Sequence, residues 1–396
     1  MTTHSWPAVS YESLPWQSRD DLQASRATRL RARQTYRAAV TAPIATQNVE
    51  LPADVLAEAD DASQHIARFD AELGAEIVSF APILLRTESA ASSKIEHLTA
   101  SSRAIAEAAL GFGSRNASLI VANQRAMSAA IELADRIDAE AILNMHDALL
   151  GSSAPAIAGK FRSEQVWIGG GNFSPHDAVF VPPHHERVAT AIDDLIRFID
   201  RADIPTLAHA AIAHAQFETI HPFPDGNGRV GRALVHAHLR HAHLTRNITV
   251  PVSAGLLTNI KAYFAALDAY RDGDIIPIVR LFAEAAFAAL DNGRRLVYGI
   301  RHVRMDWAER VKVRQGSATW AITDTLLKQP VVSAGYLGAE LGIAQSNVYR
   351  LIEPLVDAGV LVEFTNKKRN KLWRAPDVLL VLDAFATRAG RRQGPG

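Results

Sequence analysis

The residues best suited to chemistry stand together in one short segment, residues 221–232. Within twelve positions it holds a histidine, an aspartate, three glycines, an asparagine and two arginines. Gly226 and Gly228 allow a tight turn whose N–H groups face inward, and a helix that begins there would present its first amides to an anion. The segment therefore predicts a phosphate-binding site.

The charged side chains of this segment indicate what else the site would hold. Arg229 and Arg232 lie three residues apart in the expected helix, and their planar guanidinium groups suit phosphate oxygens. Asp225 brings negative charge towards the same anion, which is favourable if a hard cation such as Mg²⁺ bridges them. His221 could take a proton from an attacking hydroxyl group, because an ordinary imidazole has a pKa of about 6.5.

The whole segment resembles the signature of the Fic family, and every fixed position of that signature is matched. The resemblance implies a protein adenylyltransferase that uses ATP and Mg²⁺ to place AMP on a Ser, Thr or Tyr hydroxyl of a target protein. It implies His221 as the general base, Asp225 as the metal ligand and Phe223 as a core anchor. The nucleotide would be bound by Gly226, Asn227, Gly228, Arg229, Val230, Gly231 and Arg232. Gly228 favours nucleotidyl transfer, since Doc toxins carry a lysine there.

A second segment, Ser92-Ser93-Lys94-Ile95-Glu96, lies in an expected helix with Ser92 and Glu96 on one face. It resembles the inhibitory motif of Fic proteins, whose glutamate binds the second arginine of the signature, here Arg232, and displaces the γ-phosphate of ATP. His97 departs from that motif, which usually has Gly or Asn at this position. The alternative is an exposed helical glutamate without a regulatory function.

Two further places resemble family features. Val166, Trp167 and Ile168 match the flap that docks the target peptide by main-chain pairing, or else form an ordinary hairpin with a packed tryptophan. Tyr263 and Phe264 match the aromatic pair near the adenine. Of these two, we expect Tyr263 to face the nucleotide and Phe264 to pack within the bundle.

Histidines also cluster just after the signature. His236, His238, His241 and His243 offer metal ligands, but only His238 and His241 are spaced to share a helix face, and cysteine is absent from the chain. We therefore expect a polar helix end rather than a zinc site. His184 and His185 are expected to face solvent.

The fold is expected to be mainly α, a Fic-type helical bundle with a small β-hairpin flap, followed by a C-terminal winged helix-turn-helix. A helix from 204 to 220 would end at His221, and another helical stretch would cover 251–289. The expected domain boundaries are an N-terminal arm 1–50, a helical region 51–116, a catalytic core 117–295, a linker helix 296–317 and the winged helix 318–396.

The sequence does not decide what the expected winged helix binds. Its third helix begins with Gln345, Ser346, Asn347 and Arg350, which could read DNA bases. However, ten Lys and Arg oppose seven Asp and Glu from residue 318 onward, a net charge of only +3. Contact with a protein, either a target or a second copy in a homodimer, is the favoured reading, and nucleic acid is the alternative.

The composition fits an intracellular enzyme. The 396 residues are 48% hydrophobic, and 42 basic side chains balance 42 acidic ones, so no overall field attracts nucleic acid or membrane. The sequence has no long apolar run and no leader-like start, and we expect a cytoplasmic protein. Other readings are a nucleotide-sensing, DNA-binding transcriptional regulator, and a Fic enzyme that transfers UMP or phosphocholine or removes AMP.

Overall fold

The computed structural model describes residues 6–16, 25, 33–171, 173–314, 316–365 and 371–390. This part of the chain is mainly α-helical, with one two-stranded and one three-stranded antiparallel sheet, which confirms the expected class. It forms two compact units, each assembled from separate stretches of the chain. The first unit takes 1–63, 126–244 and 261–283, and the second takes 64–125, 245–260 and 284–396. None of the helices within the described ranges is both long enough and apolar enough to cross a membrane.

The units differ from the consecutive domains expected from the sequence, because three long helices supply residues to both. These are α2 (Ala53–Leu73), α5 (Arg115–Glu132) and α12 (Ile276–Arg310). The segment expected as a separate linker helix is mostly the second half of α12. The helical stretch expected over 251–289 is broken at a turn in which Gly273 has a φ of +90°, a conformation that glycine adopts readily.

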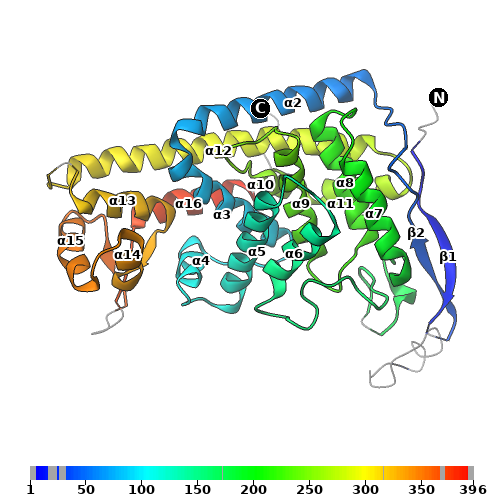
Figure 1. Cartoon of the computed structure of the whole chain (residues 1–396), viewed down its shortest axis with the longest axis horizontal. Coiled ribbons are helices and arrows are strands. Elements are labelled where there is room, and N and C mark those ends of the chain that lie inside the picture. The colour runs from blue at the N-terminus through cyan, green and yellow to red at the C-terminus, as the bar shows by residue number, and fades with distance from the viewer. Residues whose placement is uncertain are drawn as a thin grey trace. The chain divides into compact units, whose positions relative to one another are not determined.

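The first unit is a helical bundle with a β-hairpin, β1 (Ser10–Pro15) paired with β2 (Thr35–Val40), in the expected N-terminal arm. Its helices are α6 (Ala139–Leu150), α7 (Val188–Ile199), α8 (Thr206–Ile220), α9 (Asn227–His241) and α11 (Ile260–Arg271). Helix α8 packs against both α7 and α9 (Figure 1). Every residue of α8 from 207 to 220 is buried, so α8 is the central helix of this unit.

Of the four clustered histidines, His243 is exposed, as expected for a polar helix end, but two others depart from that expectation. His236 and His238 are buried, because α9 packs along most of its length. The Nε2 of His238 lies 3.1 Å from Nδ1 of His209, whose own Nε2 donates to the carbonyl of Phe198 at 2.7 Å. His184 and His185 are half-buried rather than fully solvent-facing, with ring centroids 4.0 Å apart.

This buried histidine pair predicts a loss of stability in acid. Burial lowers the pKa of His209 to about 4 and that of His238 well below its ordinary value. The unfolded chain, with a pKa near 6.5, therefore binds more protons between pH 6.5 and 4. The contribution of these histidines to the free energy of unfolding is therefore fully present above pH 6.5 and is lost as the pH falls. For His209 the loss is about 2 kcal/mol at pH 5.

Urea denaturation from pH 7.5 to 5 measures this loss. His238→Gln, whose amide can still donate to His209, should make the free energy of unfolding less dependent on pH. His302→Gln, at an exposed position of α12, should leave that dependence unchanged. An unchanged slope in His238→Gln would contradict the assignment.

The second unit contains α3 (Ile77–Ile95), α4 (Ser102–Ala109) and α10 (Val252–Leu256), together with the C-terminal elements. Buried carboxylates join its parts. Glu88 of α3 accepts hydrogen bonds from the backbone N–H and the hydroxyl of Ser253, and Asp70 accepts from the amides of Arg246, Asn247 and Ile248. The segment after α9 is thereby fixed to α2 and α3.

Helix α3 ends in a Schellman motif. The amide of His97 donates to the carbonyl of Lys94 and that of Leu98 donates to the carbonyl of Ser93, both at 3.0 Å. His97 has a φ of +60°, the left-handed conformation that Gly and Asn adopt most easily. The Gly or Asn usual at this position of the inhibitory motif would therefore suit the backbone, and His97 adopts the same conformation at a cost.

We expect His97→Gly to stabilise the chain by about 1 kcal/mol, because it removes the steric cost of a Cβ in the left-handed region. The change is measured as a shift of the urea midpoint. Asp135→Gly, at an exposed position of the first unit, is a control for the entropy of an added glycine. A destabilised His97→Gly would show that the imidazole makes a compensating contact.

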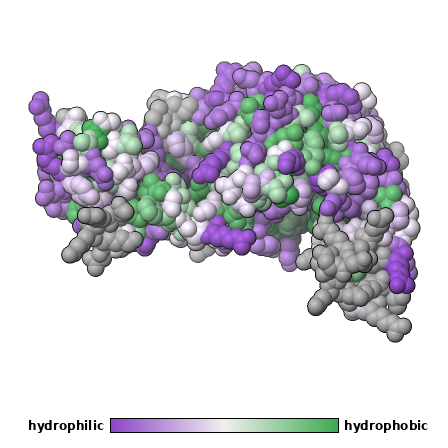
Figure 2. Space-filling view, turned by 60° about the horizontal axis from the view of Figure 1, so that its bottom comes forward, coloured by the Kyte–Doolittle hydropathy of each residue, from purple (hydrophilic) through white to green (hydrophobic). Residues whose placement is uncertain are grey.

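The C-terminal elements follow in the order α13 (Ala318–Lys328), β3 (Val331–Ser333), α14 (Ala334–Leu341), α15 (Gln345–Asp357), β4 (Val362–Glu363), β5 (Leu372–Arg374) and α16 (Pro376–Arg388). The sheet order is β3-β5-β4, and all three strands are antiparallel to their neighbours. Residues 366–370, which follow β4 and would form the tip of a wing, lie outside the described residues. These elements present mainly hydrophilic and intermediate residues on the face seen at the left of Figure 2.

Candidate active site

His221 lies directly after α8, where the chain turns towards the signature loop. It has a φ of +50° and a ψ of +61°, and its amide donates to the carbonyl of Phe217 at 2.9 Å. A left-handed conformation at a non-glycine residue is uncommon and costs energy. Here it ends the central helix and leaves the imidazole half-buried at the start of the loop.

Arg162 holds this turn in place. Its guanidinium donates from Nε to the carbonyl of His221 at 2.9 Å, from Nη1 to that of Glu164 at 3.1 Å, and from Nη2 to that of Pro183. Its own amide donates to the carbonyl of Pro222 at 2.9 Å. Burial lowers the pKa of Arg162 to about 10, so it remains a cation at neutral pH. Arg162 thus joins the turn at His221 and Pro222 to the chain at Pro183.

If the chain has the ATP-dependent transfer activity that its sequence predicts, Arg162→Met should slow this transfer by about 10- to 100-fold and change the Kd for ATP little, since small displacements of a reacting group have effects of this size. Single-turnover kinetics and calorimetry separate the two effects. Arg187→Met is the matched control, because Arg187 is exposed and its side chain pairs only with Glu12 among the described residues of this unit. A rate loss no larger than the loss of folded protein would contradict a positioning role.

The side chain of Asn227 fixes the loop from inside. Its Oδ1 accepts from the amide of Phe223 at 2.8 Å, and its Nδ2 donates to the carbonyl of the same residue at 2.9 Å. Both ends of the buried amide are therefore used within the protein. The predicted nucleotide contact of Asn227 would therefore be made by its backbone N–H at the start of α9.

His146 of α6 is a site residue that the sequence analysis missed. Its ring stacks on Phe223 with centroids 3.8 Å apart, its Nδ1 accepts from the amide of Gly159, and its Nε2 donates to the carbonyl of Asp225 at 3.1 Å. Burial lowers the pKa of this imidazole, which favours the neutral form that makes both bonds. Phe223 is fully buried, as the sequence predicts for a core anchor.

The start of α9 has the geometry of an anion site. Gly226 has a φ of +82°, and the first helical hydrogen bond runs from the amide of Val230 to its carbonyl at 3.0 Å, so the amides of residues 227 to 229 precede the helical ladder. Arg229 is 5% exposed and Arg232 is 2% exposed. Two cations buried beside a helix N-terminus favour an anion there.

Val230 and Gly231, which the sequence predicts to contact the nucleotide, have a role in helix packing. Val230 is fully buried. A Cβ on Gly231 would lie 2.6 Å from Oε1 of Glu218 and 2.9 Å from the ring of Phe217, so glycine permits α8 and α9 to approach closely. Both residues serve helix packing.

Asp225 is exposed, as a residue that meets a ligand should be. Its Oδ1 accepts from the amide of Gly226 at 2.6 Å and lies 3.5 Å from Nη2 of Arg229. A carboxylate oriented by an amide at a solvent-accessible loop fits the way proteins hold Mg²⁺, with few protein ligands and several waters. Asp225 can hold this cation beside the helix start.

The aromatic pair on α11 is arranged opposite to the prediction. Tyr263 is buried and its hydroxyl lies 2.8 Å from Nε2 of His214, whereas Phe264 is 51% exposed. Tyr263 therefore packs in the core because its helix face meets α8. Phe264 is the member of the pair that a ligand can reach.

The predicted flap is shorter than a hairpin. Ile168 forms a single bridge with Phe180, and Trp167 donates from its indole to the carbonyl of Gly171 at 2.8 Å. Trp167 also packs edge-on against Trp16. The β2 strand supports this segment, since the amide of Ala39 donates to the carbonyl of Val181 at 2.9 Å. Val166 and Trp167 are half-buried.

Ser92 and Glu96 belong to the second unit. Ser92 is fully buried within α3, and Glu96 is exposed at the C-cap, one residue beyond the last helical residue. The helix is therefore slightly shorter than expected, because the Schellman motif closes it at Ile95. The carboxylate of Glu96 is placed at a helix C-terminus, where a negative charge is unfavourable by about 0.3–1 kcal/mol.

The part of the chain that contains this site is similar to known proteins. Residues 136–239 match the Fic/DOC family model. Protein adenylyltransferase fic-1 of Caenorhabditis elegans is 31% identical over 159 residues, and protein adenylyltransferase Fic of Drosophila erecta is 33% identical over 153 residues. These alignments cover 39% and 38% of this chain and 28% of each relative, so the chain spans well under half of their length. A Fic family protein from Desulfovibrio desulfuricans G20 shares the fold, with a TM-score of 0.50 and 20% identity over 83% of this chain and 97% of that one.

Proposed function

We propose that this chain, which carries a Fic domain over residues 136–239, is a protein adenylyltransferase that moves AMP from ATP to a hydroxyl group of a protein. The observation that carries the proposal is the pairing of His221, held by Arg162 in a left-handed turn, with a helix start flanked by buried Arg229 and Arg232. One element supplies a base and the next supplies a phosphate site.

In the proposed reaction the imidazole of His221 accepts the proton of the target hydroxyl. The hydroxyl oxygen forms a bond to the α-phosphorus of ATP, the bond from that phosphorus to the bridging oxygen breaks, and pyrophosphate leaves. Amides at the start of α9, with Arg229 and Arg232, stabilise the negative charge on the phosphates. Mg²⁺ held by Asp225 would neutralise phosphate charge when bound. The flap at 166–168 would position the target main chain.

We further propose that Glu96 inhibits this reaction by pairing with Arg232. The negative charge of Glu96 follows the C-terminus of α3, and the positive charge of Arg232 lies in the first turns of α9. Each charge has the sign that the helix dipole disfavours at that end. A pair between them would compensate both. ATP bound productively would need Arg232 for its outer phosphates, so the pair and the γ-phosphate compete.

For the C-terminal elements we propose a winged helix-turn-helix that docks a protein. The order helix, strand, two helices, two strands suits that fold. A specific observation also favours the alternative, DNA binding: the first turns of α15 expose Gln345, Ser346, Asn347 and Arg350. A gel shift with genomic fragments, with and without ATP, distinguishes them. A shift that ATP alters would favour the regulator over the enzyme.

The donor is tested by intact-mass spectrometry of the Glu96→Gly chain after incubation with Mg²⁺ and one of three donors, ATP, UTP or CDP-choline. We expect addition of AMP from ATP and little from the other two. Addition of UMP or phosphocholine would support the proposed transfer reaction but would show that ATP is not the preferred donor. Loss of mass from a previously modified target would identify AMP removal instead.

A further inference from the structure

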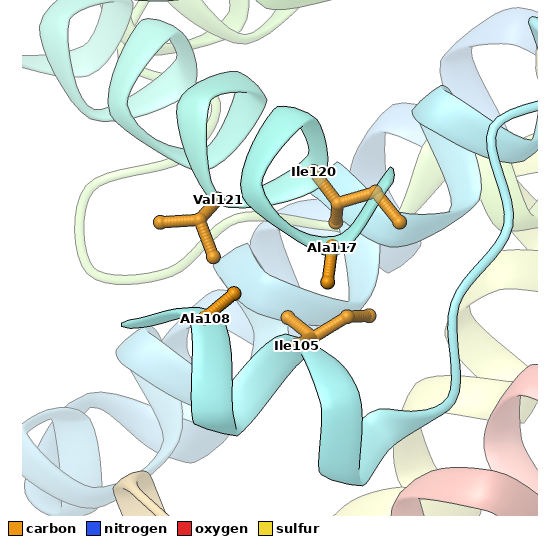
Figure 3. Close-up of a cluster of buried hydrophobic side chains, with 5 residues drawn as sticks. All are labelled: Ile105, Ala108, Ala117, Ile120 and Val121. Atoms are coloured by element: carbon orange, nitrogen blue, oxygen red, sulfur yellow. The ribbon is translucent and has the colours of Figure 1, made fainter. Parts of the chain in front are cut away.

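The second unit contains a cavity of about 150 Å³ that the proposed reaction does not use. Its lining residues come from one face of α3, from residues 98–100 that follow it, and from α4, α5 and α16, and they include Leu257. They are mostly apolar. Figure 3 shows two of these residues, Ile105 of α4 and Ile120 of α5, meeting in the same hydrophobic cluster.

One buried cation lines this cavity with unused donors. Arg86 is 9% exposed and donates from Nη2 to Oε1 of Gln329 at 2.6 Å. Among the described residues, its Nε and Nη1 have no hydrogen-bond acceptor. Burial lowers the pKa of Arg86 to about 10, so the group is charged at neutral pH. A buried guanidinium with unsatisfied donors is costly unless an anion reaches it.

Gln329, the neutral hydrogen-bond partner of Arg86, is fixed by two further hydrogen bonds. The Nε2 of Gln329 donates to the carbonyls of Ala106 and Val331, at 2.7 and 2.8 Å, which leaves Oε1 directed at the arginine. Lys94 lines the same cavity two helical turns further along α3, and no carboxylate is among the described lining residues. The cavity therefore combines positive charge with an apolar interior.

We propose that this cavity binds a small carboxylic acid with an apolar body of about one aromatic ring. A cavity of about 150 Å³ with apolar walls is large enough for benzene. A carboxylate at one end would accept charge-assisted hydrogen bonds from Arg86, and the ring would contact the isoleucine and phenylalanine side chains. Phosphate fits poorly, because most of the lining offers it no donor.

The cavity is connected to the proposed inhibitory residue through α3. Residues 86, 87, 90, 91 and 94 of α3 face the cavity, while Ser89 and Ser93 on another face bond Asn123, and Glu96 follows the helix end. A ligand would tie α3 to α4, α5 and α16 and favour the described position of its C-terminus. Given the proposed function, such a ligand strengthens inhibition through Glu96.

Calorimetric titration of benzoate into the full chain tests the binding itself. We expect saturable binding, weakened about 10- to 100-fold by Arg86→Met and largely retained by Arg86→Lys. Ala386→Leu fills the cavity from an exposed position of α16 without removing a charge, and it should also weaken binding. Benzyl alcohol lacks the charge and acetate lacks the ring, so both should bind more weakly.

Equal benzoate affinity in the wild type, Arg86→Met and Ala386→Leu would overturn the site, as would no saturable heat at millimolar benzoate. These outcomes do not depend on catalysis. For the regulatory part, benzoate should slow auto-modification of the wild type and leave Glu96→Gly unaffected. Binding without any AMP transfer by either chain would preserve the site and refute the proposed function. Binding and transfer with no effect of benzoate on the wild type would refute the regulation alone.

Discussion

Replacing His221 should abolish AMP transfer while leaving ATP binding almost intact. General-base catalysis contributes about 10²- to 10⁴-fold, and we expect a loss of about 10³-fold or more because no other described histidine lies in the signature loop. In the proposed site, ATP would be bound by the amides at the start of α9 and by Arg229 and Arg232, which the substitution does not change. Single-turnover rates and calorimetric Kd values measure the two effects separately.

The choice of variant matters because His221 has a positive φ. Alanine adopts this conformation poorly, whereas asparagine is among the residues that tolerate it best and cannot act as the base. His221→Asn should therefore be as inactive as His221→Ala but more stable. If both variants lose ATP affinity and transfer rate in equal proportion, His221 binds nucleotide and is not the base.

Replacing Glu96 with glycine should raise auto-modification by about 5- to 150-fold, the range of a typical coupling free energy between two sites. The reason is electrostatic: once the carboxylate of Glu96 is removed, the proposed pair is lost and Arg232 can bind the outer phosphates of ATP. Glu96→Gln, which keeps the size and removes the charge, should produce much of the same activation. Glu107→Gln, at another glutamate of the second unit that pairs only with Arg103 among the described residues, is the matched control.

The activation should depend on ATP concentration. Inhibition by competition for the γ-phosphate position would be partly overcome by more ATP in the wild type and would be absent in Glu96→Gly. A constant ratio of the two rates at all ATP concentrations would contradict this competition. Activation by Glu96→Gly but not by Glu96→Gln would indicate that flexibility of the α3 end, rather than charge, is responsible.

The chemistry-bearing residues could be predicted from the sequence because their types and spacing have few other uses. His221, Asp225, Arg229 and Arg232 are predicted correctly as neighbours in one loop and helix start. The structure adds what the residues between them do. Asn227 holds the loop, and Val230 and Gly231 pack where α8 and α9 meet. These packing roles could not be predicted, because local sequence does not separate a ligand contact from a packing contact.

Residues distant in sequence account for most of what was missed. Arg162 and His146 support the His221 loop through carbonyl groups, and a bond to a backbone carbonyl leaves no signature in the partner's residue type. Helix phase explains the reversed pair on α11, because a small rotation decides whether Tyr263 or Phe264 meets the core. Burial of His236 and His238 was missed because polar residues are usually exposed, and only tertiary packing overrides that rule.

In the proposed reaction the target hydroxyl attacks the α-phosphorus of ATP and not the γ-phosphorus. Incubating the Glu96→Gly chain with Mg²⁺ and ATP labelled on either the α- or the γ-phosphate tests it directly. We expect label on the protein from α-labelled ATP alone, and none on His221→Asn. Protein label from γ-labelled ATP would show phosphoryl transfer and would contradict the proposed orientation of the nucleotide in this site.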